Sequence, residues 1–128
     1  MRHAIGFALH HPDRTHLPVE RLDLAKIGSF DFRAPDDIRW PALRLAREVM
    51  ARGGMAGAVF NAAKEVALDG FIGGKLRFPQ MAEIVEDTME ALFPDNGVID
   101  AAITLDNVAQ VDHLARQAAW AAITKRAG

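Results

Sequence analysis

The segment that most restricts how this chain can fold lies between two glycine pairs, Gly53-Gly54 and Gly73-Gly74. It is apolar at almost every position and is long enough for one helix over about residues 55–72. A helix that is apolar on nearly every side is typical of a position surrounded by other helices. The segment therefore predicts the central helix of a bundle, with the glycine pairs ending this helix and the one before it.

Three more long helices are predicted around the central one. Pro41 and Pro79 each suit the start of a helix, and Asp106 can act as the N-cap residue of the last. The predicted fold class is mainly α, with a four-helix bundle over residues 36–128. The three outer helices carry their apolar residues on inward stripes, which are Ala42, Leu45, Ala46, Val49 and Met50; Met81, Ile84, Val85, Met89 and Leu92; and Val108, Val111, Ala115, Ala118 and Ala122.

The first 35 residues predict a short helix followed by an irregular arm. Residues 4–9 are apolar and precede His10-His11-Pro12, where the proline disfavours a continuing helix. Residues 27–32 alternate between apolar and polar, as a half-buried strand does. A strand cannot stand alone, because its backbone donors and acceptors need a neighbouring strand. We therefore expect an orphan strand near residues 27–32, with its partner supplied by another chain or by sequence outside these 128 residues.

Composition excludes several classes of protein. The 128 residues are 50% apolar and 25% charged, as in one ordinary globular domain. A formal net charge of −2 gives no general attraction to nucleic acid or to an anionic membrane. The absence of cysteine excludes disulfides, thiolate catalysis and zinc–thiolate sites. No apolar run approaches the roughly 20 residues of a membrane span, so we expect a cytoplasmic protein.

Three clusters of polar residues are possible sites, and each has a simpler interpretation. The spacing of His10, His11 and His16 does not bring imidazoles to one helix face, so a solvated loop fits better than a metal site. The glycine pairs match neither a P-loop nor a dinucleotide fingerprint. The other two clusters fit solvated helix faces better than a cation site or a phosphate site; they are Glu83, Glu86, Asp87 and Glu90, and Arg44, Arg47 and Arg52.

Asn61 and Glu65 stand out because they lie four positions apart inside the apolar central segment. At helical spacing, this places an amide and a carboxylate on one face of a buried helix. Such a pair could orient a substrate, but buried polar groups in a bundle more often satisfy neighbouring donors and acceptors. We therefore expect structural hydrogen bonds from both side chains. Composition and periodicity predict no catalytic, cofactor-binding or metal-binding residue in this chain.

Several short motifs occur in an order that resembles one known family. They are Met1-Arg2 with Ile5, Leu22-Asp23-Leu24, Phe30-Asp31-Phe32, Pro35-Asp36, Arg39-Trp40-Pro41, Leu45-Ala46 and Asn61-Ala62-Ala63-Lys64-Glu65-Val66-Ala67. Each motif alone is weak, whereas the ordered set is specific. It resembles the C-terminal region of 1-deoxy-D-xylulose 5-phosphate (DXP) reductoisomerase, from Met1 to at least Phe78 and more loosely to the end of the chain.

The resemblance implies an enzyme of the non-mevalonate isoprenoid pathway. That family converts DXP to 2-C-methyl-D-erythritol 4-phosphate with NADPH and a divalent cation, Mg²⁺ or Mn²⁺. Its cofactor-binding domain, acidic metal ligands and phosphate-binding residues precede the region that this chain matches. The resemblance therefore implies that this chain binds none of these cofactors and is inactive alone. Its partners would be the upstream catalytic and NADPH-binding domains within a homodimer, with no nucleic acid and no membrane.

The resemblance also implies roles for parts of this chain. It assigns residues 1–35 to the end of the connecting and catalytic region, and residues 36–128 to a C-terminal helical domain that supports the enzyme. Met1 matches the methionine of a Pro-Asp-Met-Arg motif beside the substrate pocket, so it is the one substrate-adjacent position. Two residues depart from the family pattern: Lys64 stands where asparagine is usual, and Ala4 where proline is frequent. A lysine at position 64 implies that this side chain reaches solvent or a partner.

An independent helical module that binds a protein partner is the alternative function. Removal of the upstream domains would leave an apolar patch exposed, and such patches associate with other proteins. The patch would comprise Phe7, Leu24, Ile27, Phe30 and Phe32. A DNA-binding domain is disfavoured, because the sequence shows no basic recognition helix.

Overall fold

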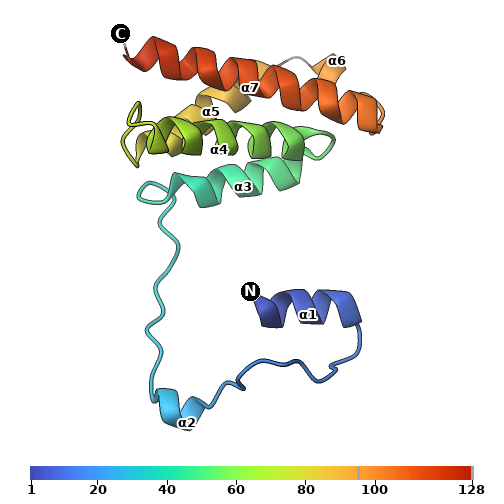
Figure 1. Ribbon diagram of the computed structural model, residues 1–128, viewed down its shortest axis with the longest axis vertical. Helices are drawn as coiled ribbons and strands as arrows, with labels where there is room; N and C mark the ends of the chain where they lie inside the picture. Colours follow the sequence, from blue (N-terminus) through green and yellow to red (C-terminus); the bar gives the residue numbers. More distant parts are fainter. Residues whose placement is uncertain (95, 128) are drawn as a thin grey trace. The chain divides into compact units, whose positions relative to one another are not determined.

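The computed structural model describes residues 1–94 and 96–127, and all regular structure within those ranges is helical. The chain divides into two compact units, Met1–Ala34 and Pro35–Gly128. The helical structure of residues 1–94 and 96–127 confirms the mainly α fold class. The helices, labelled in Figure 1, are α1 (Arg2–His10), α2 (Leu24–Ile27), α3 (Pro41–Arg52), α4 (Ala56–Ile72), α5 (Gln80–Leu92), α6 (Asn96–Ile99) and α7 (Leu105–Ala127).

The first unit contains the short helix that residues 4–9 predict, together with one further helical turn. Gly6 of α1 is buried against the loop that follows, where an added Cβ would lie 2.4 Å from Leu17 Cδ1. The turn α2 is capped by Asp23, whose carboxylate accepts a hydrogen bond from the Lys26 backbone N–H at 3.1 Å. Gly28 follows with φ of +81°, a value that favours glycine and ends the turn.

The strand expected near residues 27–32 is not present, and that prediction is wrong for this structure. Ile27 is the last residue of α2, and residues 28–36 form neither a helix nor a strand. A strand needs a neighbouring strand to pair its backbone groups. Residues 1–94 and 96–127 contain no strand that could pair with this stretch. The apolar side chains of this stretch are exposed, and Phe32 is 90% exposed.

The second unit is a bundle of four long helices, α3, α4, α5 and α7, with the short α6 before the last of them. The central helix is α4, which packs against the other three. Figure 1 shows α4 between α3 and α7, with α5 behind it. Alanines at four buried positions of α4 allow its neighbours to approach closely. The core contains Leu45, Met55, Ala56, Val59, Ala62, Ala63, Val66, Ala67, Leu76, Ile84, Val85, Met89, Ile99, Val111, Ala115, Ala119 and Ile123.

The predicted inward stripe of α3 is wider than the buried one. Leu45 is fully buried and Val49 is half-buried, as expected. Ala42 and Met50 are exposed, so the prediction is wrong at these two positions. The physical reason is the place of α3 at the edge of the bundle, where it packs mainly against α4 and α5.

The last helix begins one residue before its predicted cap. Thr104 precedes the helix, and its Oγ1 accepts a hydrogen bond from the Asn107 backbone N–H at 3.2 Å. Thr104 therefore takes the capping role predicted for Asp106. Asp106 lies in the first turn, where its negative charge interacts favourably with the positive end of the helix dipole. The fully buried residues of α7 follow four-residue steps; they are Val111, Ala115, Ala119 and Ile123. The first two belong to the predicted inward stripe, whose other members, Val108, Ala118 and Ala122, are half-buried.

The turn between α3 and α4 is held by backbone contacts with α6. Gly54 has φ of +53°, and an added Cβ there would lie 2.7 Å from the Ile99 carbonyl oxygen. That same oxygen accepts a hydrogen bond from the Met55 N–H at 3.0 Å. Beside it, the Arg52 guanidinium donates to the Asp100 carboxylate at 2.8 Å. These contacts join the start of α4 to a segment more than 40 residues away in the sequence.

Candidate functional site

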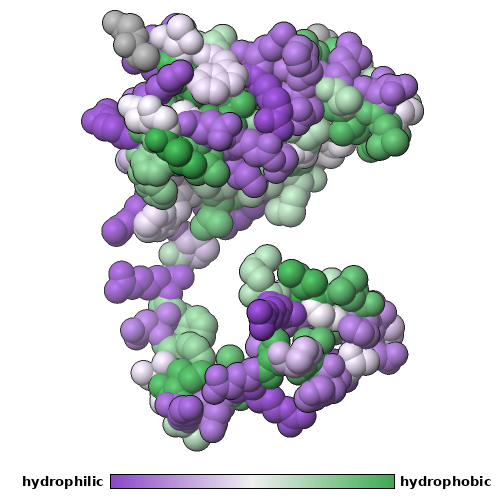
Figure 2. Space-filling model, in the orientation of Figure 1, coloured by the Kyte–Doolittle hydropathy of each residue, from purple (hydrophilic) through white to green (hydrophobic). Residues whose placement is uncertain are grey.

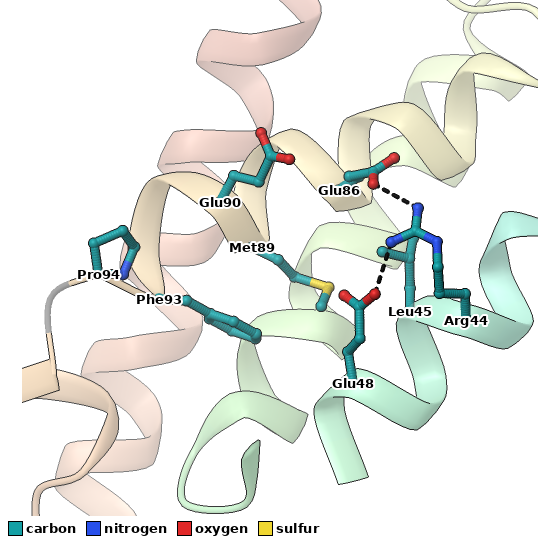
Figure 3. A pocket seen from close by; sticks show the side chains of 8 residues that line it. All are labelled: Arg44, Leu45, Glu48, Glu86, Met89, Glu90, Phe93 and Pro94. Carbon is teal, nitrogen blue, oxygen red and sulfur yellow. Dashed lines mark hydrogen bonds and ion pairs between the residues drawn. The ribbon is translucent and has the colours of Figure 1, made fainter. Parts of the chain in front are cut away.

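A pocket of about 450 Å³ lies between α3 and α5. Leu45, Met89 and Phe93 supply its apolar surface. Figure 3 shows that the side chains of Met89 and Phe93 extend from α5 towards α3. The remaining lining residues are polar or lie at the end of α5; they are Arg44, Glu48, Glu86, Glu90 and Pro94. The pocket therefore combines an apolar floor with a charged rim.

Arg44 lies at the rim of the pocket, where its guanidinium forms ion pairs within α3 and with α5. Its guanidinium donates to Glu48 Oε1 at 2.7 Å on its own helix and to Glu86 Oε1 at 2.5 Å on α5. Figure 3 shows both bonds, with the Glu90 carboxylate lying apart from them. The hydrogen bond to Glu86, followed by the one to Glu48, raises the pKa of Arg44 above its ordinary value. Because the guanidinium stays charged, Arg44 joins α3 to α5 and does not act as an acid or a base.

Asn61 and Glu65 lie on the solvent side of α4, so the expectation that they are buried is wrong. Asn61 Nδ2 donates to Glu65 Oε1 at 3.0 Å, and Arg116 Nη2 of α7 donates to Glu65 Oε2 at 2.6 Å. Arg116 Nε also donates to Asp112 Oδ2 at 2.7 Å on its own helix. The hydrogen bonds expected of the pair are therefore present, and they link α4 to α7 at the surface of the bundle.

Replacing Glu65 with glutamine should lower stability at neutral pH and flatten its loss in acid. The pKa of Glu65 is held below its ordinary value, first by the hydrogen bond from Arg116 and then by that from Asn61. A carboxyl group with a lowered folded-state pKa stabilises the fold above its unfolded-state pKa. That contribution disappears as the pH falls through the folded-state pKa. Urea unfolding midpoints measured from about pH 3 to pH 7 test this expectation.

The exposed glutamate Glu90 on α5 is the matched control for that experiment. Glu90→Gln removes the same charge without removing the bonds to Arg116 and Asn61. We expect the acid limb of its stability curve to follow that of the unchanged chain. Identical curves for Glu65→Gln and Glu90→Gln would contradict a specific contribution from the Glu65 network.

The acidic face of α5 was expected to be solvated, and part of it instead binds α7. Arg126 Nε donates to Asp87 Oδ2 at 2.9 Å, and Arg126 Nη1 donates to Glu83. The hydrogen bond to Asp87 is the main cause that raises the pKa of Arg126 above its ordinary value. Arg44, Arg116 and Arg126 thus each join a different pair of helices in the bundle.

The other sequence candidates are placed without forming a common site. Arg47 pairs with Asp37 at 2.8 Å. His10 Nδ1 lies 2.8 Å from the carbonyl oxygen of Gly6 on its own helix. Within residues 1–94 and 96–127, no group of three or more histidine and carboxylate side chains is positioned to hold a metal ion. Within the same ranges, none of the helices has the length and apolar character needed to cross a lipid bilayer.

Met1 precedes α1 as its N-cap residue and is 95% exposed. Its substrate-adjacent role stays a prediction.

Arg116 was not among the residues that the sequence suggested as candidates. Its spacing of four residues from Asp112 is a helical ion-pair signal that could have identified the first half of its network. Its second partner, Glu65, lies 51 residues away in the sequence.

Comparisons with known proteins agree on one family. The family model described as "DXP reductoisomerase C-terminal domain" matches residues 1–118. The 1-deoxy-D-xylulose 5-phosphate reductoisomerase of Ruegeria pomeroyi is 64% identical over all 128 residues, which correspond to 32% of that protein. The reductoisomerase of Jannaschia sp. is 54% identical over 125 residues, again 32% of its length. The chain thus spans about a third of the length of the relatives that it matches.

Solved structures of the same family share the fold. The Zymomonas mobilis reductoisomerase in complex with NADPH is 37% identical, with a TM-score of 0.68 over 93% of this chain and 30% of that one. A DOX-P reductoisomerase with fosmidomycin and magnesium is 30% identical, with a TM-score of 0.78 over 96% of this chain and 32% of that one. The match over residues 1–118 and these shared folds show that the chain belongs to the DXP reductoisomerase C-terminal domain family.

Proposed function

We propose that this chain is the C-terminal part of a DXP reductoisomerase and that it supports the enzyme rather than performing the reaction. The longer protein would convert DXP to 2-C-methyl-D-erythritol 4-phosphate. The observation that carries the proposal is the 64% identity over the whole chain to a protein of that name. The supporting role follows from the polar side chains of the bundle, since Arg44, Arg116 and Arg126 are engaged in joining helices.

The cofactors and partners belong to the longer protein in this proposal. Similar structures have been solved with NADPH and with magnesium, which supports NADPH and Mg²⁺ or Mn²⁺ as the cofactors of the complete enzyme. The partners of this chain would be the upstream catalytic and NADPH-binding domains, in a cytoplasmic homodimer that binds no nucleic acid. Residues 1–35 would end the connecting region, with Met1 beside the substrate pocket.

Removing the helical bundle from the longer reductoisomerase tests this supporting role. A truncation before Pro35 deletes the second unit at the boundary between the two units. We expect NADPH oxidation in the presence of DXP and Mg²⁺ to fall to background, because the catalytic domain loses the surface that holds its elements in place. Binding of NADPH, measured by fluorescence titration, should persist as the control for a folded cofactor domain. A truncated enzyme with unchanged kcat/KM would contradict the proposal.

The exposed apolar side chains of the first unit favour a second candidate, an independent protein-binding module. Each of the five side chains expected in that patch is exposed; they are Phe7, Leu24, Ile27, Phe30 and Phe32. Exposed apolar patches associate in solution. Under this candidate, light scattering of the isolated chain should show self-association as the concentration rises. A monomer at all concentrations would argue against it.

A further inference from the structure

The central helix α4 has a side that the bundle does not cover. Its sequence is apolar around almost the whole circumference, which predicts neighbours on every side. In the structure, α3, α5 and α7 pack against α4. The solvent side of α4 carries Asn61 and Glu65, and its C-terminal half also exposes Leu68, Phe71 and Ile72, which lie at helical spacing on one face.

These residues form a continuous apolar surface with the loop that follows α4. The ring of Phe78 contacts that of Phe71, with centroids 5.9 Å apart. We define the α4 outer face as Leu68, Phe71, Ile72 and Phe78. Figure 2 shows hydrophobic side chains over the left-hand part of the bundle, where Figure 1 places the C-terminal half of α4.

The border of this face is polar. On one side, Glu65 is bound by Arg116 of α7. On another, the Lys75 ammonium lies 4.9 Å from the centroid of the Trp120 ring. An apolar centre with a polar rim that includes arginine and tryptophan is the usual composition of a protein interface.

We propose that the part of the reductoisomerase preceding this chain packs on the α4 outer face. This inference rests on the proposed function and names the surface that would receive the upstream domains. The relatives are about three times as long as the chain, so a large covering surface is available within the same polypeptide. An intramolecular cover also accounts for the large apolar side chains that α4 exposes although it packs against three other helices. A second copy of the chain is the competing occupant.

Cysteine labelling can test the cover directly, because the 128 residues contain no natural cysteine. Ile72→Cys places a thiol on the α4 outer face, and Met50→Cys places one on α3. The two positions are matched, since Ile72 is 73% and Met50 75% exposed. Each variant is prepared as the isolated chain and within the longer reductoisomerase. The rate of maleimide labelling at each position is then followed by peptide mass spectrometry.

The expected result is equally fast labelling of both positions in the isolated chain. In the longer protein, position 72 should react at least about tenfold more slowly while position 50 keeps its rate. Unchanged labelling at position 72, or equal slowing at both positions, would overturn the inference. Slowing at position 72 that grows with the concentration of the isolated chain would instead identify a second copy as the occupant, and would overturn it too.

NADPH oxidation by the longer protein without substitutions is measured in parallel and separates the two proposals. Turnover of DXP together with fast labelling at position 72 would refute the docking surface and leave the proposed function standing. Absence of turnover together with protection at position 72 would refute the proposed function and leave the docking surface standing.

Discussion

Replacing Gly54 with alanine is expected to lower the free energy of unfolding of the bundle by roughly 2–4 kcal/mol. Gly54 has φ of +53°, in the left-handed region that an alanine rarely adopts, and the new Cβ would lie 2.7 Å from the Ile99 carbonyl oxygen. That oxygen is backbone and cannot rotate away as a side chain would. Relief of the contact would also weaken the bond that Ile99 accepts from Met55. Urea unfolding followed by circular dichroism measures the change.

Gly57→Ala is the matched control for this prediction. Gly57 lies in α4, three residues further along, and an added Cβ there would meet nothing within 4 Å. Alanine is a better helix former than glycine, so this variant should be more stable by up to about 1 kcal/mol. A Gly54→Ala protein as stable as Gly57→Ala would contradict the backbone contact between the start of α4 and α6.

Replacing Ile84 with alanine should lower the free energy of unfolding by roughly 2–5 kcal/mol. Ile84 lies on α5, is fully buried, and belongs to the core shared with α4. The substitution removes buried methyl groups and leaves a cavity that close-packed neighbours fill only in part. The measurement is again the urea unfolding midpoint.

Ile103→Ala removes the same atoms from a side chain that is 71% exposed. Surface changes of this kind usually stay within about 0.5 kcal/mol. Similar destabilisation by Ile84→Ala and Ile103→Ala would contradict the burial of Ile84 in the core between α4 and α5.

The bundle could be predicted from the sequence because glycine, proline and periodicity mark its helices. Gly53 and Gly73 follow the last residues of α3 and α4, as expected of stop signals. The prediction failed where a structure depends on a partner. Residues 27–32 alternate like a strand, but alternation cannot provide the neighbouring strand that the backbone requires. Local signals also misplaced a cap by two residues, because Thr104 and Asp106 are both good N-cap residues.

The candidate site was less predictable because its contacts join distant parts of the sequence. Spacing within one helix correctly paired Asn61 with Glu65, and it could have paired Asp112 with Arg116. It could not show that Arg116 reaches Glu65, which depends on how α7 crosses α4. Spacing within one helix also could not show which side of an apolar helix remains open to solvent. For this reason the burial expected for Asn61 and Glu65 was wrong.

We propose that this chain supports a reductoisomerase without carrying its chemistry. The most direct test measures NADPH oxidation by the purified 128-residue chain and by the longer reductoisomerase, with DXP and Mg²⁺ supplied to both. Circular dichroism first establishes that the isolated chain is helical, so that inactivity does not reflect unfolding. We predict turnover by the longer protein and none by the isolated chain. Turnover of DXP by the isolated chain would contradict the account.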